Sequence, residues 1–122
     1  MSVDAATHAT SIYKLCGGTE WASAVQTGVY LGSIDDKRDG FIHFSSGPQL
    51  AETARRYFSG QRDLVLVAFD AASLGEQLKW EPSRGGELFP HLYAELPASK
   101  ALWVKTIDLD AAGVPVLPKG IA

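Results

Sequence analysis

The sequence predicts an α+β fold, with a curved or split, mostly antiparallel β-sheet and two main helices. Three observations support this class. Both helix-like patterns come early in the chain, most strand-like segments come late, and no βαβ unit repeats. The 122 residues suffice for one hydrophobic core, so we expect a single globular domain over residues 11–117. The small, polar residues 1–10 predict a disordered N-terminal segment, and residues 118–122 predict a C-terminal tail.

The first half of the chain alternates short strands with helices. Thr19 is the expected N-cap of a helix with Trp21 on its buried side, and Gly28 is the expected residue that ends it. The predicted elements are a strand at 12–15, a helix at 20–27, a strand at 29–31, a polar loop at 33–40 and a strand at 41–45.

A second helix and most of the sheet follow. Ser46 and Gln49 have the spacing of a capping box, and Pro48 suits the first turn of a helix at 48–58. The apolar run at 64–69 is typical of a central strand buried on both faces. Further strands are predicted at 78–81, 88–95 and 101–109, which gives a sheet of about six strands with a loose tail behind it.

Composition excludes several classes of function. The net charge of −3 argues against broad binding to nucleic acid, which needs many Lys and Arg side chains. No apolar run is long enough to span a bilayer, and residues 1–10 lack the pattern of a secretory signal. Cys16 is the one cysteine, so an intramolecular disulfide is excluded. We expect a cytoplasmic protein with no membrane partner.

Polar side chains gather on one face of the strand at 41–45. Because side chains alternate, His43 and Ser45 share a face while Ile42 and Phe44 point into the core. Ser46 then begins a helix, whose free N–H groups favour a phosphate or carboxylate. The alternative is structural: Ser46 only caps the helix, and His43 is a half-buried residue of the sheet.

The segment 87–96 repeats this pattern. One face carries His91, Tyr93 and Glu95, the other face is apolar, and Pro90 predicts an edge or an irregular start of the strand. The preceding Gly-rich loop carries Arg84, whose guanidinium suits a phosphate, although an ordinary exposed arginine is the simpler alternative. We expect His43 and His91 to line one hollow.

Two histidines on polar strand faces indicate acid–base chemistry near neutral pH, so His43 and His91 are the candidate catalytic residues. Ser45, Ser46, Arg84, Tyr93 and Glu95 are the candidate ligand-binding residues. A metal site on His43, His91 and Glu95 lacks any established ligand spacing, and we predict none. Cys16 as a nucleophile has equally little support, since a lone thiol is more often buried. The three tryptophans are predicted to belong to the core.

Three motifs together resemble the bacterial family called domain of unknown function 952. They are Ile12-Tyr13-Lys14 with Trp21 and Gly28, then Gly40-Phe41-Ile42-His43-Phe44-Ser45, and Phe89-Pro90-His91-Leu92-Tyr93. The resemblance covers nearly all of residues 11–117.

A more distant resemblance is to RNA 2′-phosphotransferases, which have the ADP-ribosyltransferase-like fold. His43-Phe44-Ser45 is similar to their His-x-Ser motif, although Lys14-Leu15-Cys16 stands where they carry His-Gly-Thr. This resemblance implies that NAD is a possible cofactor and that His43 and Ser45 contact a ribose or a phosphate.

The first functional interpretation is an enzyme that acts on NAD or a nucleotide-like substrate through His43 and His91, by ADP-ribosyl or 2′-phosphate transfer. The alternative is a noncatalytic module that binds a small anionic or nucleotide-like ligand. A protein-interaction domain and a metal-dependent hydrolase are further possibilities.

Overall fold

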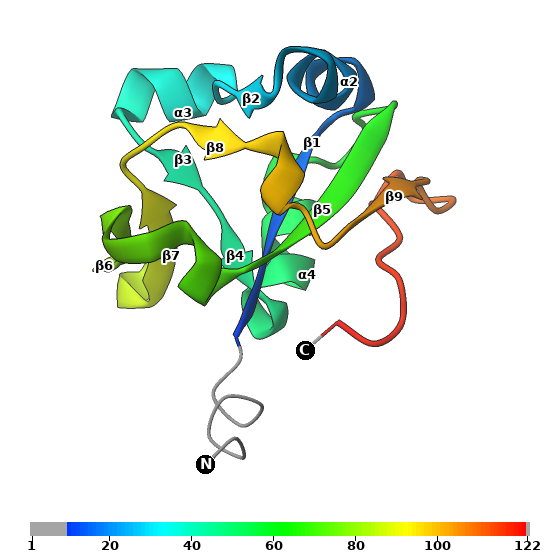
Figure 1. The fold of residues 1–122 in the computed structure, drawn as a ribbon. Helices are drawn as coiled ribbons and strands as arrows, with labels where there is room; N and C mark the ends of the chain where they lie inside the picture. Colours follow the sequence, from blue (N-terminus) through cyan, green and yellow to red (C-terminus); the bar gives the residue numbers. More distant parts are fainter. Residues whose placement is uncertain (1–9, 122) are drawn as a thin grey trace.

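The computed structural model of the protein describes residues 10–121. Residues 1–9, which make up most of the segment predicted to be disordered, and Ala122 lie outside this range. Figure 1 shows α2, β2 and α3 together along one side of the molecule, with α4 near the opposite end of β1. Within residues 10–121 no helix is long and apolar enough to cross a membrane.

Helices and strands alternate over the first half of the chain, and strands dominate the second. The helices are α2 (Gly18–Thr27), α3 (Ile34–Asp39) and α4 (Gly47–Tyr57), with 3₁₀ helices η1 (Ala71–Gln77), η2 (Arg84–Gly86) and η3 (Ala98–Lys100). The strands are β1 (Ser11–Gly17), β2 (Val29–Tyr30), β3 (Ile42–His43), β4 (Ser45–Ser46), β5 (Leu64–Asp70), β6 (Leu78–Pro82), β7 (Leu88–Leu92), β8 (Leu96–Pro97) and β9 (Trp103–Ile107).

Within residues 10–121 the strands form three separate sheets. Their orders are β4-β1-β5-β9, β2-β8 and β3-β7-β6, and every pairing among the described residues is antiparallel. The predicted α+β class with a split, mostly antiparallel sheet is therefore confirmed.

Strand β5 is the centre of the largest sheet, as its apolar run predicted. It pairs with β1 along seven residues, from Ser11↔Asp70 to Gly17↔Leu64, and with β9 on its other side. Its side chains alternate between two hydrophobic clusters. Leu66 packs on the α4 side with Leu50, whereas Phe69 packs on the α2 side with Trp21. Both faces of β5 are thus buried.

The ends of the helices follow the predictions except at one position. The Gln49 side chain accepts the Ser46 N–H at 3.0 Å at the start of α4, and Gly28 ends α2 with φ 96°. Thr19, however, does not cap α2. The helix begins at Gly18, and the Glu20 carboxylate accepts the N–H of Gly17 at 3.1 Å.

The prediction of a polar loop at 33–40 is wrong, because this segment contains α3. The Ser33 side chain accepts the Asp36 N–H at 3.1 Å, and the Asp36 carboxylate accepts the Ser33 N–H at 2.9 Å, which is a capping box. Gly40 ends the helix with φ 86°. Its sequence has no apolar periodicity, and its ion pairs with β1 and β3 come from Asp36 and Asp39, so a hydrophobic pattern could not reveal the helix.

The strand predicted at 41–45 is interrupted at Phe44. Strand β3 pairs with β7, whereas β4 pairs with β1, so the chain passes from one sheet to another within four residues. Ile42 and Phe44 are buried in the core, as predicted. This change from one sheet to the other places His43 beside β7 and Ser45 beside β1.

The strand predicted at 88–95 ends at Leu92. Strand β7 lies between β3 and β6, so Pro90 is not in an edge strand. Its missing N–H is tolerated because β3 ends at this level, where the Pro90 carbonyl accepts the Phe44 N–H at 3.0 Å. The expected single buried face is also wrong. His91 on the polar face is as buried as Leu92, whereas Leu88 on the apolar face is exposed.

Two smaller expectations need correction. Trp80 is 41% exposed on β6 and does not belong to the core, whereas Trp21 is buried as predicted. The C-terminal tail is not loose, because Leu117 and Ile121 pack against the hydrophobic cluster that includes Leu50. Folded structure therefore extends past the predicted boundary at residue 117.

The core contacts of Phe69 predict a large cost for its removal. Phe69 is fully buried, and its ring packs edge-on against Trp21 and Phe44. We expect Phe69→Ala to lower the free energy of unfolding by about 3–5 kcal/mol in urea denaturation. Val104→Ala, at a half-exposed position of the neighbouring β9, should cost less than about 1 kcal/mol. Equal losses from both variants would contradict the assigned core.

Candidate functional site

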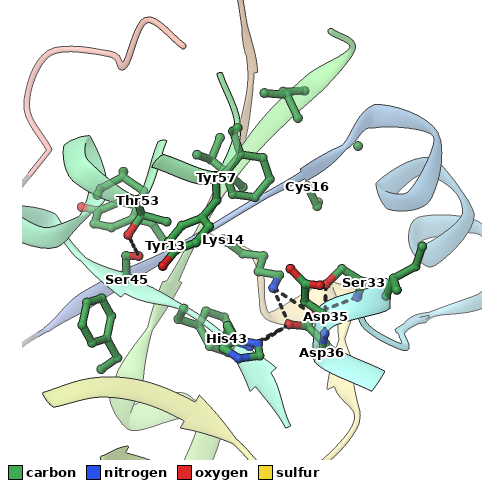
Figure 2. Close-up of a pocket in the computed structure, with 18 of the residues that line it drawn as sticks. Tyr13, Lys14, Cys16, Ser33, Asp35, Asp36, His43, Ser45, Thr53 and Tyr57 are labelled. Carbon is green, nitrogen blue, oxygen red and sulfur yellow. Dashed lines mark hydrogen bonds and ion pairs between the residues drawn. The ribbon is translucent and has the colours of Figure 1, made fainter. Parts of the chain in front are cut away.

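A cavity of about 540 Å³ lies on the side of β1 that faces α4. Figure 2 shows β1 crossing this region, with α4 to one side and the start of α3 to the other. Helix α3 contributes Asp36 and Asp39 to the wall, and α4 contributes Thr53 and Tyr57. His43, Ser45, Arg84 and His91 also belong to the polar part of the lining.

The two predicted histidines meet at this cavity. His43 in β3 and His91 in β7 are directly paired across the strands, and their ring centroids lie 5.5 Å apart. The side chain of His43 is 33% exposed, whereas that of His91 is only 5% exposed. Two imidazoles separated by 48 positions in the chain therefore share one wall of a cavity, as expected from the sequence.

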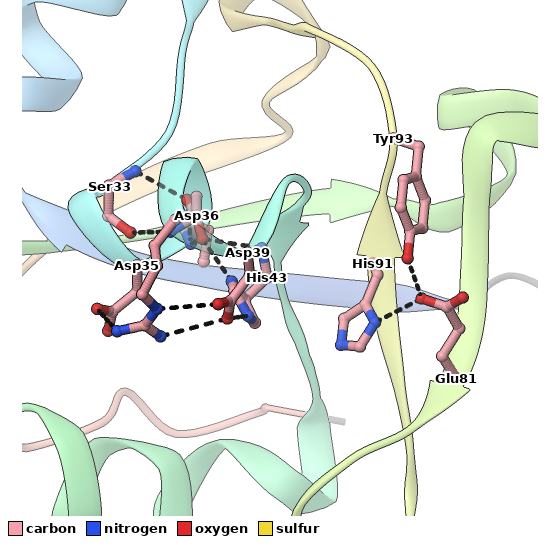
Figure 3. A network of polar contacts seen from close by, with 10 residues as sticks. Ser33, Asp35, Asp36, Asp39, His43, Glu81, His91 and Tyr93 are labelled. Carbon is pink, nitrogen blue, oxygen red and sulfur yellow. Dashed lines mark hydrogen bonds and ion pairs between the residues drawn. The ribbon is translucent and has the colours of Figure 1, made fainter.

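His43 is held between two carboxylates of α3, as Figure 3 shows. Its Nδ1 lies 2.7 Å from Oδ1 of Asp36, and its Nε2 lies 3.0 Å from Oδ2 of Asp39. A carboxylate oxygen only accepts hydrogen bonds, so both contacts are satisfied together by a ring that carries a proton on each nitrogen. The Asp39 contact is the more accessible of the two, because Asp39 is 32% exposed and also binds Arg38.

Asp36 is a buried carboxylate at the junction of three elements. It pairs with the Lys14 ammonium of β1 at 2.8 Å, accepts the backbone N–H of His43 at 3.1 Å and binds the His43 ring. Burial alone would raise the pKa of Asp36, but the His43 hydrogen bond and the Lys14 charge outweigh it and hold this pKa well below its usual range. The side chain therefore stays ionised and fixes the orientation of His43.

His91 has its own carboxylate. Its Nδ1 lies 2.8 Å from Oε1 of Glu81 in β6, and the Tyr93 hydroxyl donates to the same oxygen at 2.7 Å. Hydrogen bonds from Tyr93 and His91 lower the pKa of Glu81. Phe41 stacks on the His91 ring at 4.0 Å between centroids. These contacts fix both the plane of the ring and its tautomer.

The second nitrogen of His91 is unoccupied. Nδ1 donates to Glu81, and Nε2 makes no hydrogen bond within residues 10–121. Figure 3 shows Nε2 on the side of the ring away from Glu81. Because His91 lines the cavity and Glu81 does not, the free nitrogen belongs to the side of the ring that faces it. A neutral His91 thus offers a lone pair there.

Arg84 lies at the part of the wall formed by α4. Its two terminal nitrogens each lie 3.4 Å from Oγ1 of Thr53, which also contacts the Ser45 hydroxyl at 2.9 Å. The guanidinium lies over the rings of Phe89 and Tyr57 at 4.8 and 5.7 Å. Arg84 and Ser45, predicted separately from two segments, therefore belong to one cluster.

The other predicted ligand-binding residues lie outside this cavity. Ser46 begins α4, where its N–H is already bonded to Gln49. Tyr93 reaches His91 only through Glu81. Glu95 lines a second, smaller cavity beside Tyr30. A direct ligand contact from any of these three stays a prediction.

Sequence reasoning missed the carboxylates that orient both histidines. Asp36 and Asp39 fall in the segment taken for a loop, and Glu81 was assigned only to a strand. The Ser33–Asp36 capping spacing and Gly40 were available signals for the helix that carries two of them. Glu81 and Thr53 had no local signal, because their roles depend on long-range strand pairing and helix packing.

Neither a metal nor a thiolate finds support in the geometry. Within residues 10–121 no group of three His, Cys, Asp or Glu side chains has an arrangement that could hold a metal ion. Burial raises the pKa of the Cys16 thiol to about 12, so this thiol stays protonated near neutral pH.

Comparison with known proteins gives a family without an assigned activity. The family model described as "Protein of unknown function (DUF952)" matches residues 15–104. The chain is similar to the crystal structure of protein CC0527 from Caulobacter crescentus, with 52% identity, a TM-score of 0.86, and 88% of this chain and 95% of that chain covered. The solution NMR structure of CC0527 matches with 51% identity, a TM-score of 0.78, and coverage of 86% and 90%. A search of curated proteins found no match.

The buried Asp36 predicts a dependence of stability on pH. Because its pKa is lower in the folded chain, its ionisation contributes stability that is full above the unfolded value of about 4 and is lost as the pH falls below it. We expect Asp36→Asn to lose about 3–5 kcal/mol at pH 7, since Lys14 is left buried without its partner.

Urea unfolding of the wild type and of Asp36→Asn between pH 7 and pH 3 measures this pH dependence of the free energy of unfolding. Stability should fall less steeply with pH in Asp36→Asn than in the wild type. The matched control is Asp35→Asn, at the adjacent and exposed position of α3, which should stay within about 0.5 kcal/mol of the wild type. An unchanged slope in Asp36→Asn would assign the acid sensitivity to other groups.

Proposed function

The chain belongs to the DUF952 family of proteins of unknown function, and we propose from the geometry of its cavity that it is an enzyme that transfers protons on a small, nucleotide-like substrate. His43 and His91 are the proposed acid–base pair. The observation that carries this proposal is their shared position: adjacent rings line one cavity, and a carboxylate binds Nδ1 of each.

The two rings are prepared for opposite roles. His43 faces two carboxylates, and a proton on each ring nitrogen satisfies both contacts, so we assign it as the proton donor once a ligand displaces the exposed Asp39 from Nε2. His91 donates a hydrogen bond from Nδ1–H to Glu81 and presents the Nε2 lone pair, so it serves as the base. Pairs of titratable groups in contrasting surroundings are the usual way in which acid and base are assigned in enzymes.

The cavity suits a ligand of nucleotide size. Its volume of about 540 Å³ lies within the range of roughly 300–1,000 Å³ that is typical of small-molecule sites. Arg84 adds positive charge to the wall, and Tyr57 and Phe89 add aromatic surface. NAD is included among the proposed ligands because His43 and Ser45 lie together in the wall, as the ADP-ribosyltransferase-like relation would require.

A noncatalytic binding module is the second candidate. It is favoured by the engagement of both His43 nitrogens, since a ring that stays bound to Asp36 and Asp39 orients a ligand without exchanging a proton. The two candidates share the cavity and differ only in turnover, so a search for reaction products separates them.

Replacing either histidine should abolish activity with little loss of affinity. We expect NAD, ADP-ribose or a mononucleotide to raise the melting temperature of the wild type, because a ligand that binds only the folded state stabilises it. For the substrate found in this way, His91→Gln and His43→Gln should each lower kcat by about 10²–10⁴-fold, measured by chromatography of the products.

The control for these variants is Glu76→Gln, an exposed carboxylate away from the cavity, which should behave as the wild type. If the ligand stabilises the wild type and no product forms, the binding module replaces the enzyme. If neither nucleotides nor NAD change the melting temperature, both candidates fail.

Glu81 is expected to act as a positioning residue for His91. Glu81→Gln keeps the shape of the side chain but replaces an ionised acceptor with a weaker, neutral one, so we expect kcat to fall by about 10-fold or more and the pH–rate profile to shift. Tyr93→Phe removes only the second hydrogen bond to Glu81 and should have a smaller effect. A Glu81→Gln profile that matches the wild type at every pH would remove this role.

A further inference from the structure

Among the residues that the structure describes, Arg84 is a largely buried cation without a close carboxylate. Its side chain is only 16% exposed, and its nearest acidic oxygen, Oε2 of Glu52, lies 3.8 Å from Nε. That oxygen already accepts from Arg56 at 2.7 Å. Arg38, by contrast, binds Asp35 and Asp39 at 2.9–3.1 Å. Removing a charge from water is costly unless an opposite charge or good hydrogen bonds replace the hydration.

The hydrogen bonds that Arg84 makes are poor ones. Both terminal nitrogens point to Oγ1 of Thr53 at 3.4 Å, close to the limit for such a bond. This oxygen donates its own proton to the Gln49 carbonyl at 3.1 Å and lies 2.9 Å from the Ser45 hydroxyl. A hydroxyl oxygen has two lone pairs, so three donors cannot all be satisfied there. Arg84 therefore keeps unused donors.

The guanidinium is nevertheless held in place. It lies 4.8 Å from the centroid of the Phe89 ring and 5.7 Å from that of Tyr57. Contacts with ring faces orient the plane of an arginine without using its N–H groups. The cluster of Arg84, Thr53 and Ser45 thus combines a fixed, desolvated cation with two hydroxyl groups on the wall of the cavity.

We propose that this cluster is the subsite for a phosphate group of the substrate, with Arg84 as its anchor and the Ser45 hydroxyl as a second donor. This inference rests on the proposed function of the same cavity. The phosphate would accept two N–H groups of the guanidinium fork, and Ser45 would turn its proton from Thr53 to a phosphate oxygen. A carboxylate offers one oxygen fewer to the same three donors.

The position of Ser45 relates this subsite to the histidines. Ser45 follows His43 by two residues and both line the cavity, a separation of about 6–7 Å along extended chain. A phosphate at Arg84 therefore places the atoms attached to it, such as the sugar of a nucleotide, toward His43 and His91. In this arrangement the phosphate is bound and not transferred, and the proton transfer occurs on the adjoining part of the substrate.

Inorganic phosphate is the simplest probe of this subsite. Titrated into the ¹⁵N-labelled full chain at constant ionic strength, it should shift the amide signals of residues 45, 53 and 84. AMP should bind more tightly than adenosine. Arg84→Gln should weaken phosphate binding by about 10- to 100-fold, as expected for charge-assisted hydrogen bonds. The phosphate affinity of Arg84→Lys should fall between those of the wild type and Arg84→Gln, because lysine keeps the positive charge but lacks the planar guanidinium.

The matched control is Arg55→Gln, an exposed arginine of α4 that should bind phosphate as the wild type does. Wild-type affinity in Arg84→Gln, equal affinities for AMP and adenosine, or amide shifts elsewhere would overturn the subsite. Should Arg84→Gln not fold, Ser45→Ala and the amide map of the wild type decide in its place.

Phosphate binding is measured without turnover, so the phosphate subsite and the acid–base function can be tested independently of each other. Phosphate bound at Arg84 in a protein that forms no product would remove the acid–base function and leave the subsite. Turnover that depends on His43 and His91, together with phosphate binding that does not depend on Arg84, would remove the subsite and leave the acid–base function.

Discussion

The buried carboxylate of Asp36 is the interaction on which the geometry of the cavity depends. Asp36 joins β1 through Lys14, joins β3 through the ring and backbone of His43, and closes the first turn of its own helix through Ser33. A carboxylate is stable inside a protein only when its charge is neutralised and its oxygens accept hydrogen bonds, and these partners meet both conditions. Helix α3 has little apolar surface with which to pack, so this polar junction fixes its place.

A second constraint is the change of sheet at Phe44. The short segment around this residue begins in the sheet that contains β7 and ends in the sheet that contains β1. The burial of Ile42 and Phe44 anchors the segment, and the alternation of side chains then places His43 and Ser45 on the cavity side. One segment therefore contributes both to the proposed acid–base pair and to the Arg84 cluster.

The candidate site was partly accessible from sequence. His43, Ser45, His91 and Arg84 were predicted because imidazoles on polar strand faces suit acid–base chemistry and a guanidinium suits a phosphate, with a structural role as the alternative for each. Asp36 and Asp39 were missed because α3 is held by charge and caps, which leave no hydrophobic period. Glu81 was missed because its side chain matters only once β6 lies beside β7. Tyr93 and Glu95, by contrast, follow the same alternating pattern as His91 and yet lie outside the main cavity.

The sequence by itself determined the local features of this protein: the buried central strand β5, the capping box at Ser46, the end of α2 at Gly28, and the positions of the two histidines in strands. These features depend on periodicity, capping and backbone freedom, which act over a few neighbouring residues. The tertiary structure alone decided that His43 pairs with His91, that each ring contacts a carboxylate, and that Arg84 lies against α4 with only weak hydrogen bonds to Thr53. Such contacts join residues tens of positions apart, and they exist only because folding buries the apolar side chains around β5 and brings distant strands together.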